Sequence, residues 1–332
     1  DGHRANMGFE QYGGYAKLGY EISDHWNAWA DMNVTHFNAS NPGETFDPLI
    51  DNDQRITRGM TSLALENRYE KTSGTLSFFY NWGRHKINDG YQIGKEPQKS
   101  HFNSKDKMLG VSWYQSATFF TGNRLTVGFD YQHFGGESWN KVLATGEHTP
   151  GVDKQMDEFA GYVDFRQDIS SWFSLDAGIR VDHHSHVGTE WIPQGGLAFH
   201  LPKNAELKAM VSKGYRNPTI REMYMFPPAN PELKPEKLIN YELSYSQRLL
   251  EGVLSYGISL YYINGDNLIM SNGLFSPLNI NSGEIENWGV ETNIGYHINS
   301  HWNVNANYSW LHMENPVLAA PEHKLYAGAD YT

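Results

Sequence analysis

The sequence predicts an all-β protein, an antiparallel transmembrane β-barrel. Three observations predict this class: strict apolar–polar alternation in several stretches, tryptophans at the ends of those stretches, and short connections that alternate with long ones. The mean hydropathy is −0.60. No apolar run approaches the ~20 residues that a membrane-spanning helix needs. A helical membrane protein is therefore excluded.

Alternation is clearest at 254–262. Leu254, Tyr256, Ile258 and Leu260 share one parity, and small polar residues occupy the other. Five more stretches follow the same rule: 26–34, 76–82, 125–131, 173–181 and 302–310. In a membrane barrel the apolar parity faces lipid and the polar parity lines the lumen, with aromatic rings where hydrocarbon meets water. Such rings stand at or near the predicted strand ends, namely Trp26, Trp82, Trp172, Trp302 and Trp310. A soluble β-sandwich or solenoid is the alternative.

Turn signals divide the chain into about fifteen strands, with ends uncertain by two to four residues. Short connections are expected at 23–25, 71–74, 121–123, 170–171, 202–204, 250–252 and 299–301. Longer ones are expected at 39–56, 85–104, 134–155, 183–190, 214–236, 264–284 and 312–322. Short periplasmic turns and long extracellular loops alternate in this way in bacterial outer-membrane barrels. An odd strand count does not close such a barrel, so residues 1–332 are expected to be a partial barrel domain, an interior fragment.

The amino-acid composition excludes several classes of function. The chain has 38 acidic and 26 basic residues and a formal charge of −12, which argues against nucleic-acid binding. It has no cysteine, so a disulfide framework, a thiol nucleophile and a zinc ribbon are excluded. No G-x-S-x-G elbow or other nucleophile motif occurs, and no enzymatic activity and no cofactor are expected.

Two segments carry a family resemblance. The first runs through Gly214-Tyr215-Arg216-Asn217-Pro218 to Tyr224, continues with Asn230-Pro231-Glu232-Leu233-Lys234-Pro235-Glu236 and ends at Tyr241-Glu242. The second is Asn281–Glu291, with Pro321-Glu322-His323-Lys324 one hairpin later. These motifs resemble the middle of the barrel in TonB-dependent outer-membrane receptors, the family of siderophore, haem and cobalamin receptors.

The resemblance implies about fifteen strands of a barrel of about 22 with a plugged lumen, in the outer membrane of a Gram-negative bacterium. About three strands would precede Asp1 and about four would follow Thr332. The N-terminal plug and the segment that engages TonB lie outside the sequence. The implied function is active uptake of an iron chelate, a ferric siderophore or haem. The implied partners are the TonB–ExbB–ExbD complex, outer-membrane lipid, the chelate itself and a surface lipoprotein.

Three histidines are candidate ligands for a transition metal or an iron porphyrin. Asp182 is followed by His183, His184 and His186 at a predicted long-side loop. Imidazoles grouped within a few residues can bind such groups. A solvated polar loop would have the same composition, and both interpretations stay open.

The first motif supplies further ligand-binding candidates. Arg216 and Arg221 would serve an anionic chelate if they were unpaired at the outer rim. Apolar and aromatic side chains there could contact a planar chelate, or could simply pack the loop: Met223, Tyr224, Met225 and Phe226. Charged residues of lumen parity, such as Arg180 and Asp182, are expected to pair structurally.

The ligand stays open at this stage. Haem receptors of the family carry a histidine between the two parts of the first motif, and this sequence has none there. A cobalamin receptor of the same family is an alternative to an iron-chelate receptor. A passive porin or channel is the alternative from another class, because a fold does not fix a function.

Overall fold

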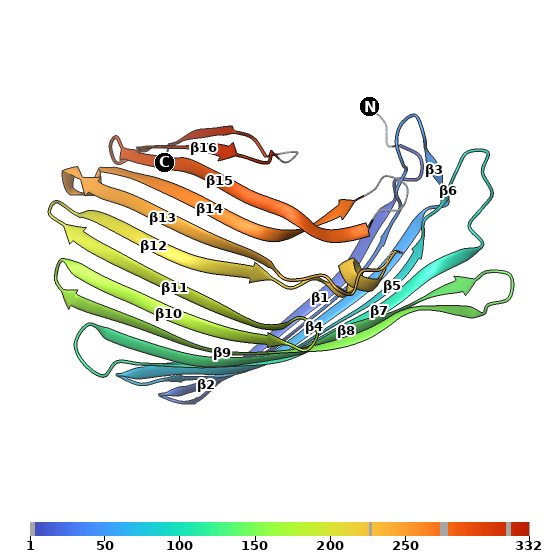
Figure 1. Cartoon of the computed structure of the whole chain (residues 1–332), viewed down its shortest axis with the longest axis horizontal. Helices are drawn as coiled ribbons and strands as arrows, with labels where there is room; N and C mark the ends of the chain where they lie inside the picture. The colour runs from blue at the N-terminus through green and yellow to red at the C-terminus, as the bar shows by residue number, and fades with distance from the viewer. Residues whose placement is uncertain (1–3, 226–227, 273–277, 317–319, 332) are drawn as a thin grey trace. The chain divides into compact units, whose positions relative to one another are not determined.

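The computed structural model describes residues 4–225, 228–272, 278–316 and 320–331. The long strands are β1 (Phe9–Ser23), β2 (Trp26–Ala39), β4 (Asp53–Arg68), β5 (Thr72–Asn88), β7 (Ser100–Ala117), β8 (Asn123–Val142), β9 (His148–Ser170), β10 (Phe173–His184), β11 (Gly188–Leu201), β12 (Ala205–Arg216), β13 (Glu236–Leu249), β14 (Leu254–Asn272), β15 (Leu278–His297), β16 (Trp302–Met313) and β17 (His323–Tyr331). They form one 15-stranded sheet in chain order (Figure 1). The predicted all-β class and the predicted number of strands are confirmed.

Short elements complete the described chain. Strands β3 (Leu49–Ile50) and β6 (Tyr91–Gln92) pair with each other in a separate two-stranded sheet. A single π-helical turn, η1 (Arg221–Met225), and a 3₁₀ turn, η2 (Leu250–Gly252), lie between long strands. None of the helical segments in the described ranges has the length and apolar character to cross a membrane.

The chain divides into two compact units. Unit 1 comprises Asp1–Gln115, Gly128–Ala160 and His183–Gly188. Unit 2 comprises Ser116–Val127, Gly161–Asp182 and Thr189–Thr332.

In unit 1 the pairing of β4 with β5 shows how alternation forms an apolar face. Leu63 lies opposite Phe78, and Leu65 lies opposite Leu76. The side chains of Leu63 and Leu76 are 48% and 46% exposed, whereas Ala64 on the other face is only 6% exposed. The larger apolar side chains therefore point away from the protein, as a lipid-facing sheet requires.

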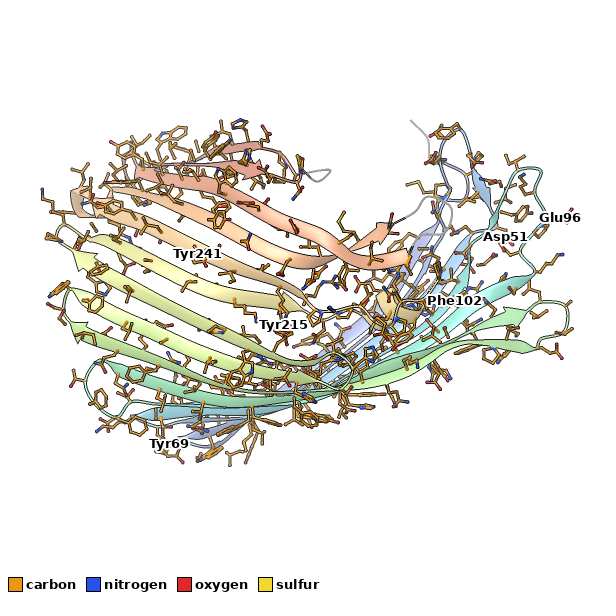
Figure 2. The ribbon with its side chains drawn as sticks, viewed as in Figure 1. Asp51, Tyr69, Glu96, Phe102, Tyr215 and Tyr241 are labelled. Carbon is orange, nitrogen blue, oxygen red and sulfur yellow. The ribbon has the colours of Figure 1, made fainter. Side chains whose placement is uncertain are left out.

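Unit 2 repeats this arrangement in β13 and β14. Leu243 pairs with Leu260, and Tyr241 pairs with Tyr262 with ring centroids 6.2 Å apart. Tyr241 lies midway along β13, and Tyr215 lies near the end of β12 (Figure 2). Of the described residues, six hydrophobic side chains are buried, and these are Ala64, Met156, Ala160, Ala205, Met223 and Leu233. A soluble sandwich would bury its alternating apolar residues in a core, so that alternative fails.

Of the five tryptophans predicted at or near strand ends, Trp26, Trp172 and Trp302 lie at short-turn ends beside other aromatic rings, whereas Trp82 lies inside β5. At the β1–β2 turn the Trp26 indole N–H donates to the Tyr69 hydroxyl at 2.8 Å. In unit 2, Trp172 lies within ring-contact distance of Phe199, and Trp302 within 5.0 Å of Tyr331. Tryptophan and tyrosine suit this level because one end of the ring system is apolar and the other can stay hydrated.

Three predicted long loops are wrong, because the strands continue further than expected. The predicted loop 134–155 is reduced to the five residues between Val142 and His148. Of the predicted loop 264–284, the residues up to Asn272 and from Leu278 onward are strand, and 273–277 lie outside the described residues. The predicted loop 183–190 is reduced to the three residues between His184 and Gly188. Beyond the lipid a strand no longer needs an apolar face, so the alternation fades while the backbone pairing persists. The turn predicted at 71–74 begins earlier, since the Tyr69 N–H donates to the Thr72 carbonyl at 2.8 Å.

Candidate functional site on the loop side of unit 2

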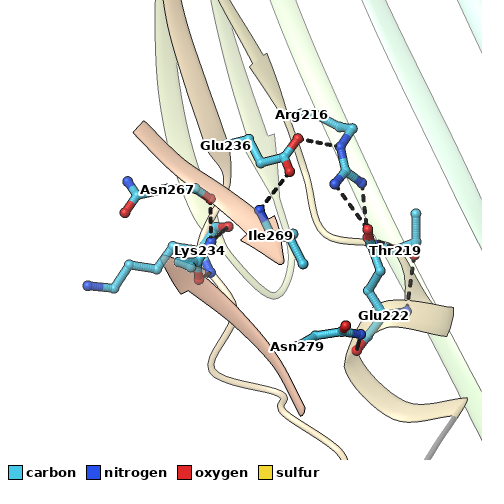
Figure 3. Close-up of polar contacts among 9 residues, drawn as sticks. Arg216, Thr219, Glu222, Lys234, Glu236, Asn267, Ile269 and Asn279 are labelled. Atoms are coloured by element: carbon cyan, nitrogen blue, oxygen red, sulfur yellow. Dashed lines mark hydrogen bonds and ion pairs between the residues drawn. The ribbon is translucent and has the colours of Figure 1, made fainter. Parts of the chain in front are cut away.

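Arg216 joins two strands and the connection between them. It is the last residue of β12 and lies opposite Glu236, the first residue of β13. Its Nε donates to Glu236 at 2.6 Å, and its two terminal nitrogens donate to both carboxylate oxygens of Glu222 at 2.9 and 3.0 Å (Figure 3). A planar guanidinium is suited to such two-point binding of a carboxylate. These three residues are called the Arg216 hub.

The turn that presents Glu222 is fixed by a capping box. The N–H and hydroxyl of Thr219 donate to the Glu222 carboxylate at 2.8 and 2.9 Å, and the Glu222 N–H donates back to the Thr219 hydroxyl at 3.1 Å. This is the reciprocal arrangement of a Thr-x-x-Glu sequence at a helix start. The capping-box signal is already visible in the sequence as Thr219-Ile220-Arg221-Glu222.

The hub also contacts the β14–β15 hairpin. The second carboxylate oxygen of Glu236 accepts the Ile269 N–H of β14 at 2.8 Å. The Asn279 side chain of β15 donates to the Glu222 carbonyl at 2.9 Å. Connection 217–235 and the hairpin are therefore both held to residues of the Arg216 hub (Figure 3).

Asn281 makes a second link between these segments. Its side-chain oxygen accepts the Lys234 N–H at 2.8 Å, and its amide donates to the carbonyls of Lys234 at 2.9 Å and Asn267 at 2.7 Å. Asn230 adds a third, because its amide donates to the Asn279 carbonyl at 2.7 Å. These bonds brace the connection against the hairpin, and together with the Arg216 hub they are called the loop brace.

The motif residues of the resemblance mainly support this brace. Met223 is fully buried and Leu233 is 2% exposed, and Pro218 is also buried. Tyr215 and Asn217 are half-buried, whereas Pro231 and Glu232 are exposed. Met223 is therefore a packing residue of the loop rather than an accessible contact surface.

The other candidates of this segment differ in accessibility. Arg221 is exposed, and Tyr224 and Met225 are half-buried. Phe226 lies outside the described residues. Arg216 does not meet the condition set for its role as a chelate ligand, because its guanidinium pairs with two carboxylates.

The contacts within the Arg216 hub shift the pKa values of its three charged side chains. Burial raises the pKa of Glu222, but the hydrogen bonds from Arg216 and Thr219 outweigh it and leave that pKa below the ordinary value. The hydrogen bond from Arg216 lowers the pKa of Glu236 against a smaller effect of burial. Both carboxylates raise the pKa of Arg216. Two carboxylates for one guanidinium leave the hub with a net negative charge.

A pH dependence follows from these two lowered pKa values. The loop brace should be fully formed above about pH 4.5, the ordinary carboxyl pKa, and should weaken as the pH falls through the lower folded-state values. We expect proteolytic nicking within 217–235 to increase at acid pH, measured with an acid-active protease on the purified full-length protein. A Glu222→Gln/Glu236→Gln variant should be cleaved at a rate that changes little with pH, and an equal acid response in that variant would contradict the prediction.

The three predicted histidines belong to unit 1 and lie at the β10–β11 turn, not on a long loop. His184 is 1% exposed, and its Nδ1 accepts the backbone N–H groups of His186 and Val187 at 3.1 and 3.3 Å. His183 and His186 are exposed. His184 thus closes the turn, and within the described ranges no three His, Asp or Glu side chains are grouped to hold a metal ion.

Arg180 and Asp182, two of the lumen-parity charges in unit 2, form an ion pair. The Arg180 guanidinium donates to the buried Asp182 carboxylate at 3.1 Å. Near the loop end, Glu190 accepts both Lys213 at 3.1 Å and Lys237 at 2.5 Å. These ion pairs are structural contacts within the strands.

Residues 2–332 match the family model described as "TonB dependent receptor-like, beta-barrel". The chain therefore belongs to the TonB-dependent receptor β-barrel family, which is an outer-membrane family of receptors and transporters. The predicted family, fold and location are confirmed.

Curated relatives of two kinds match the chain. The vitamin B12 transporter BtuB of Photobacterium profundum is 27% identical over 170 residues, covering 49% of this chain and 27% of the relative. BtuB of Vibrio vulnificus is 22% identical over 307 residues, covering 88% of this chain and 47% of the relative. The iron-regulated outer membrane virulence protein of Vibrio cholerae is 25% identical over 211 residues, covering 52% of this chain and 31% of the relative. The matched parts span less than half the length of these relatives.

Solved structures show the same fold. A mutant of the ferric enterobactin receptor PfeA from Pseudomonas aeruginosa superposes with a TM-score of 0.80 at 14% identity, covering 97% of this chain and 55% of that chain. The siderophore receptor PirA from Acinetobacter baumannii superposes with a TM-score of 0.79 at 14% identity, covering 98% of this chain and 56% of that chain.

Proposed function

We propose that the full-length protein takes up an iron chelate, a ferric siderophore or haem, across the outer membrane with energy delivered through TonB. The family match over residues 2–332 carries this proposal. The iron-regulated relative of Vibrio cholerae supports iron as the metal. Cobalamin is the second candidate, favoured by BtuB relatives that match up to 88% of the chain.

The loop brace supports a receptor whose extracellular binding surface is preformed. Connection 217–235 is fixed to β14 and β15 by the contacts of Glu222, Glu236 and Asn281. A rigid loop loses less conformational entropy when a ligand binds. Of the predicted contact residues in unit 2, the accessible ones are Arg221, Tyr224 and Met225. His183 and His186 are the accessible candidates of unit 1.

A deletion strain grown on single nutrient sources tests the function. We expect loss of growth on one ferric siderophore or on haem, restored by the full-length gene only in a strain with intact TonB, ExbB and ExbD. Unchanged growth on every iron source, with loss of cobalamin-dependent growth, would favour the second candidate. Restoration without TonB would overturn the active mechanism in favour of a passive channel.

The histidines are tested separately, without disturbing the turn. His183→Ala/His186→Ala removes the two exposed rings and leaves the buried His184 in place. If haem is the ligand and these rings contact it, growth on haem should fall while growth on ferric siderophores stays unchanged. Equal growth of the variant and the wild type on haem would show that neither histidine contributes to the haem site. A Thr189→Ala variant, at an exposed neighbour, is the control.

A further inference from the structure

Three apolar side chains lie together near the loop end of the β14–β15 hairpin in unit 2. They are called the apolar ledge: Leu268 and Met270 of β14 and Ile280 of β15. Met270 lies opposite Ile280 in the register of the two strands, and Leu268 lies opposite Gly283. The ledge therefore spans both strands of the hairpin.

The ledge lies on the lumen side of the hairpin. A Cβ placed at Gly283 would meet the Leu268 Cβ and the Met270 Sδ, each at 2.7 Å, so both side chains lie over this glycine. Gly283 shares its parity along β15 with Glu291, a residue of lumen parity, whereas Val290 belongs to the lipid-facing parity. The ledge is thus separate from the apolar band that lipid covers.

Met270 stays accessible although its side chain is apolar and faces away from the lipid. It is 51% exposed. Connection 217–235 has its own buried apolar residues, since Met223 is fully buried and Leu233 is 2% exposed. A ledge that served only to pack this loop would be covered in the same way. A group of apolar side chains left accessible at an aqueous surface indicates a contact surface for another molecule.

The loop brace holds the hairpin that carries the ledge. Ile269, between the two ledge positions of β14, donates its N–H to Glu236 at 2.8 Å. Asn279, next to Ile280 in the chain, donates its side chain to the Glu222 carbonyl at 2.9 Å (Figure 3). A contact surface on a braced hairpin loses little conformational entropy when a ligand covers it.

The ledge offers apolar contact and no charge. The nearest guanidinium of the brace, that of Arg216, is occupied by the carboxylates of Glu222 and Glu236. The Met270 thioether is polarizable and makes favourable contacts with aromatic rings, and methionine adapts to surfaces of different shape. The chemistry of the ledge therefore suits a flat, apolar face better than a charged group.

We propose that the apolar ledge contacts an aromatic or macrocyclic face of the transported chelate, and that Met270 sets the preference for such chelates. This inference rests on the proposed receptor function. The class of ligand comprises porphyrins, corrinoids and catecholate siderophores, because their rings present apolar faces. It leaves out chelates built on aliphatic hydroxamates.

The test measures equilibrium binding by the purified full-length protein in detergent. The probes are haem, cyanocobalamin, a ferric tricatecholate and a ferric trihydroxamate. We expect the bound probe to be one of the first three. Met270→Ser should bind it about tenfold more weakly, because the contact of an apolar side chain that the ligand buries is lost. Met270→Leu keeps the apolar volume and should bind within about twofold of the wild type.

Two further measurements separate ligand contact from a structural role. In Met270→Ser the Ile269 amide should stay as protected from hydrogen exchange as in the wild type, because its bond to Glu236 does not involve the thioether. Met32→Ser is the matched control, at a 52% exposed methionine of the lipid-facing parity of β2, and should bind normally. Should Met270→Ser fail to fold, Ile280→Thr should weaken binding of the same probe.

Equal affinity of the wild type and Met270→Ser for an aromatic or macrocyclic probe would overturn the inference and leave the receptor function standing. Binding of the trihydroxamate alone would overturn it as well. Loss of Ile269 protection in Met270→Ser would show that the methionine supports the hairpin instead of contacting the ligand. Failure of all four probes to bind would overturn the proposed function together with this inference.

Discussion

Replacing Arg216 with methionine should release connection 217–235 from the β14–β15 hairpin. The change leaves Glu222 and Glu236 facing each other without the cation that holds them. Because the arginine side chain is 44% exposed, solvent screening reduces the loss, and we expect local opening to become easier by about 2 kcal/mol. Hydrogen exchange of the Thr219 and Ile269 amides, which donate to these carboxylates, should then accelerate roughly thirtyfold.

Two comparison variants make the Arg216 result specific. Lys234→Met removes an exposed positive charge from the same connection and should leave both amides protected. Adding Glu222→Gln and Glu236→Gln to Arg216→Met removes the uncompensated charges and should recover part of the protection. Unchanged exchange in Arg216→Met would show that the hydrogen bonds of the asparagines hold the loop without the hub.

Asn281→Leu should have the second large effect. Leucine has a similar size but removes three hydrogen bonds, one accepted from Lys234 and two donated to the carbonyls of Lys234 and Asn267. At about 0.5–1.5 kcal/mol for each of the three bonds, opening of the loop should become easier by roughly 1.5–4.5 kcal/mol. Exchange of the Lys234 amide measures this directly, and ligand affinity should fall with it if the braced loop is part of the binding surface.

Asn287→Leu is the matched control for Asn281→Leu. Asn287 lies on the same strand, and its side chain makes no hydrogen bond to the residues that the structure describes. Its replacement should leave the Lys234 amide protected. If both variants exposed that amide equally, the effect would come from β15 as a whole rather than from the Asn281 contacts.

Much of the fold could be predicted from the sequence, because successive side chains of a strand in lipid alternate between the lipid and the lumen. Leu254, Ile258 and Leu260 share one parity for this reason. Strand ends beyond the lipid could not be predicted this way. The end of β14 has the apolar residues Leu268, Ile269 and Met270 in succession, and the end of β8 has apolar residues without regular alternation, so neither end shows the pattern of a strand in lipid.

The candidate site could be predicted less well. The first motif located the right connection, but Glu222, Glu236 and Asn281 were not among the predicted site residues, although Thr219 and Glu222 carry a capping-box signal. Asn281 contacts Lys234 across 47 positions of sequence, a pairing that no local pattern reveals. The histidines illustrate the opposite problem, because adjacent residues of a strand point to opposite faces, and His183 and His184 therefore cannot act side by side.

The scarcity of buried hydrophobic side chains has a consequence for anyone handling the molecule. The described residues form almost no hydrophobic core, so the apolar outer face must be covered by lipid or detergent. The measured stability therefore includes the free energy of the contacts with that lipid or detergent. Melting temperatures recorded in two different detergents would describe two different systems. Comparisons among variants are meaningful only when the coating is kept the same.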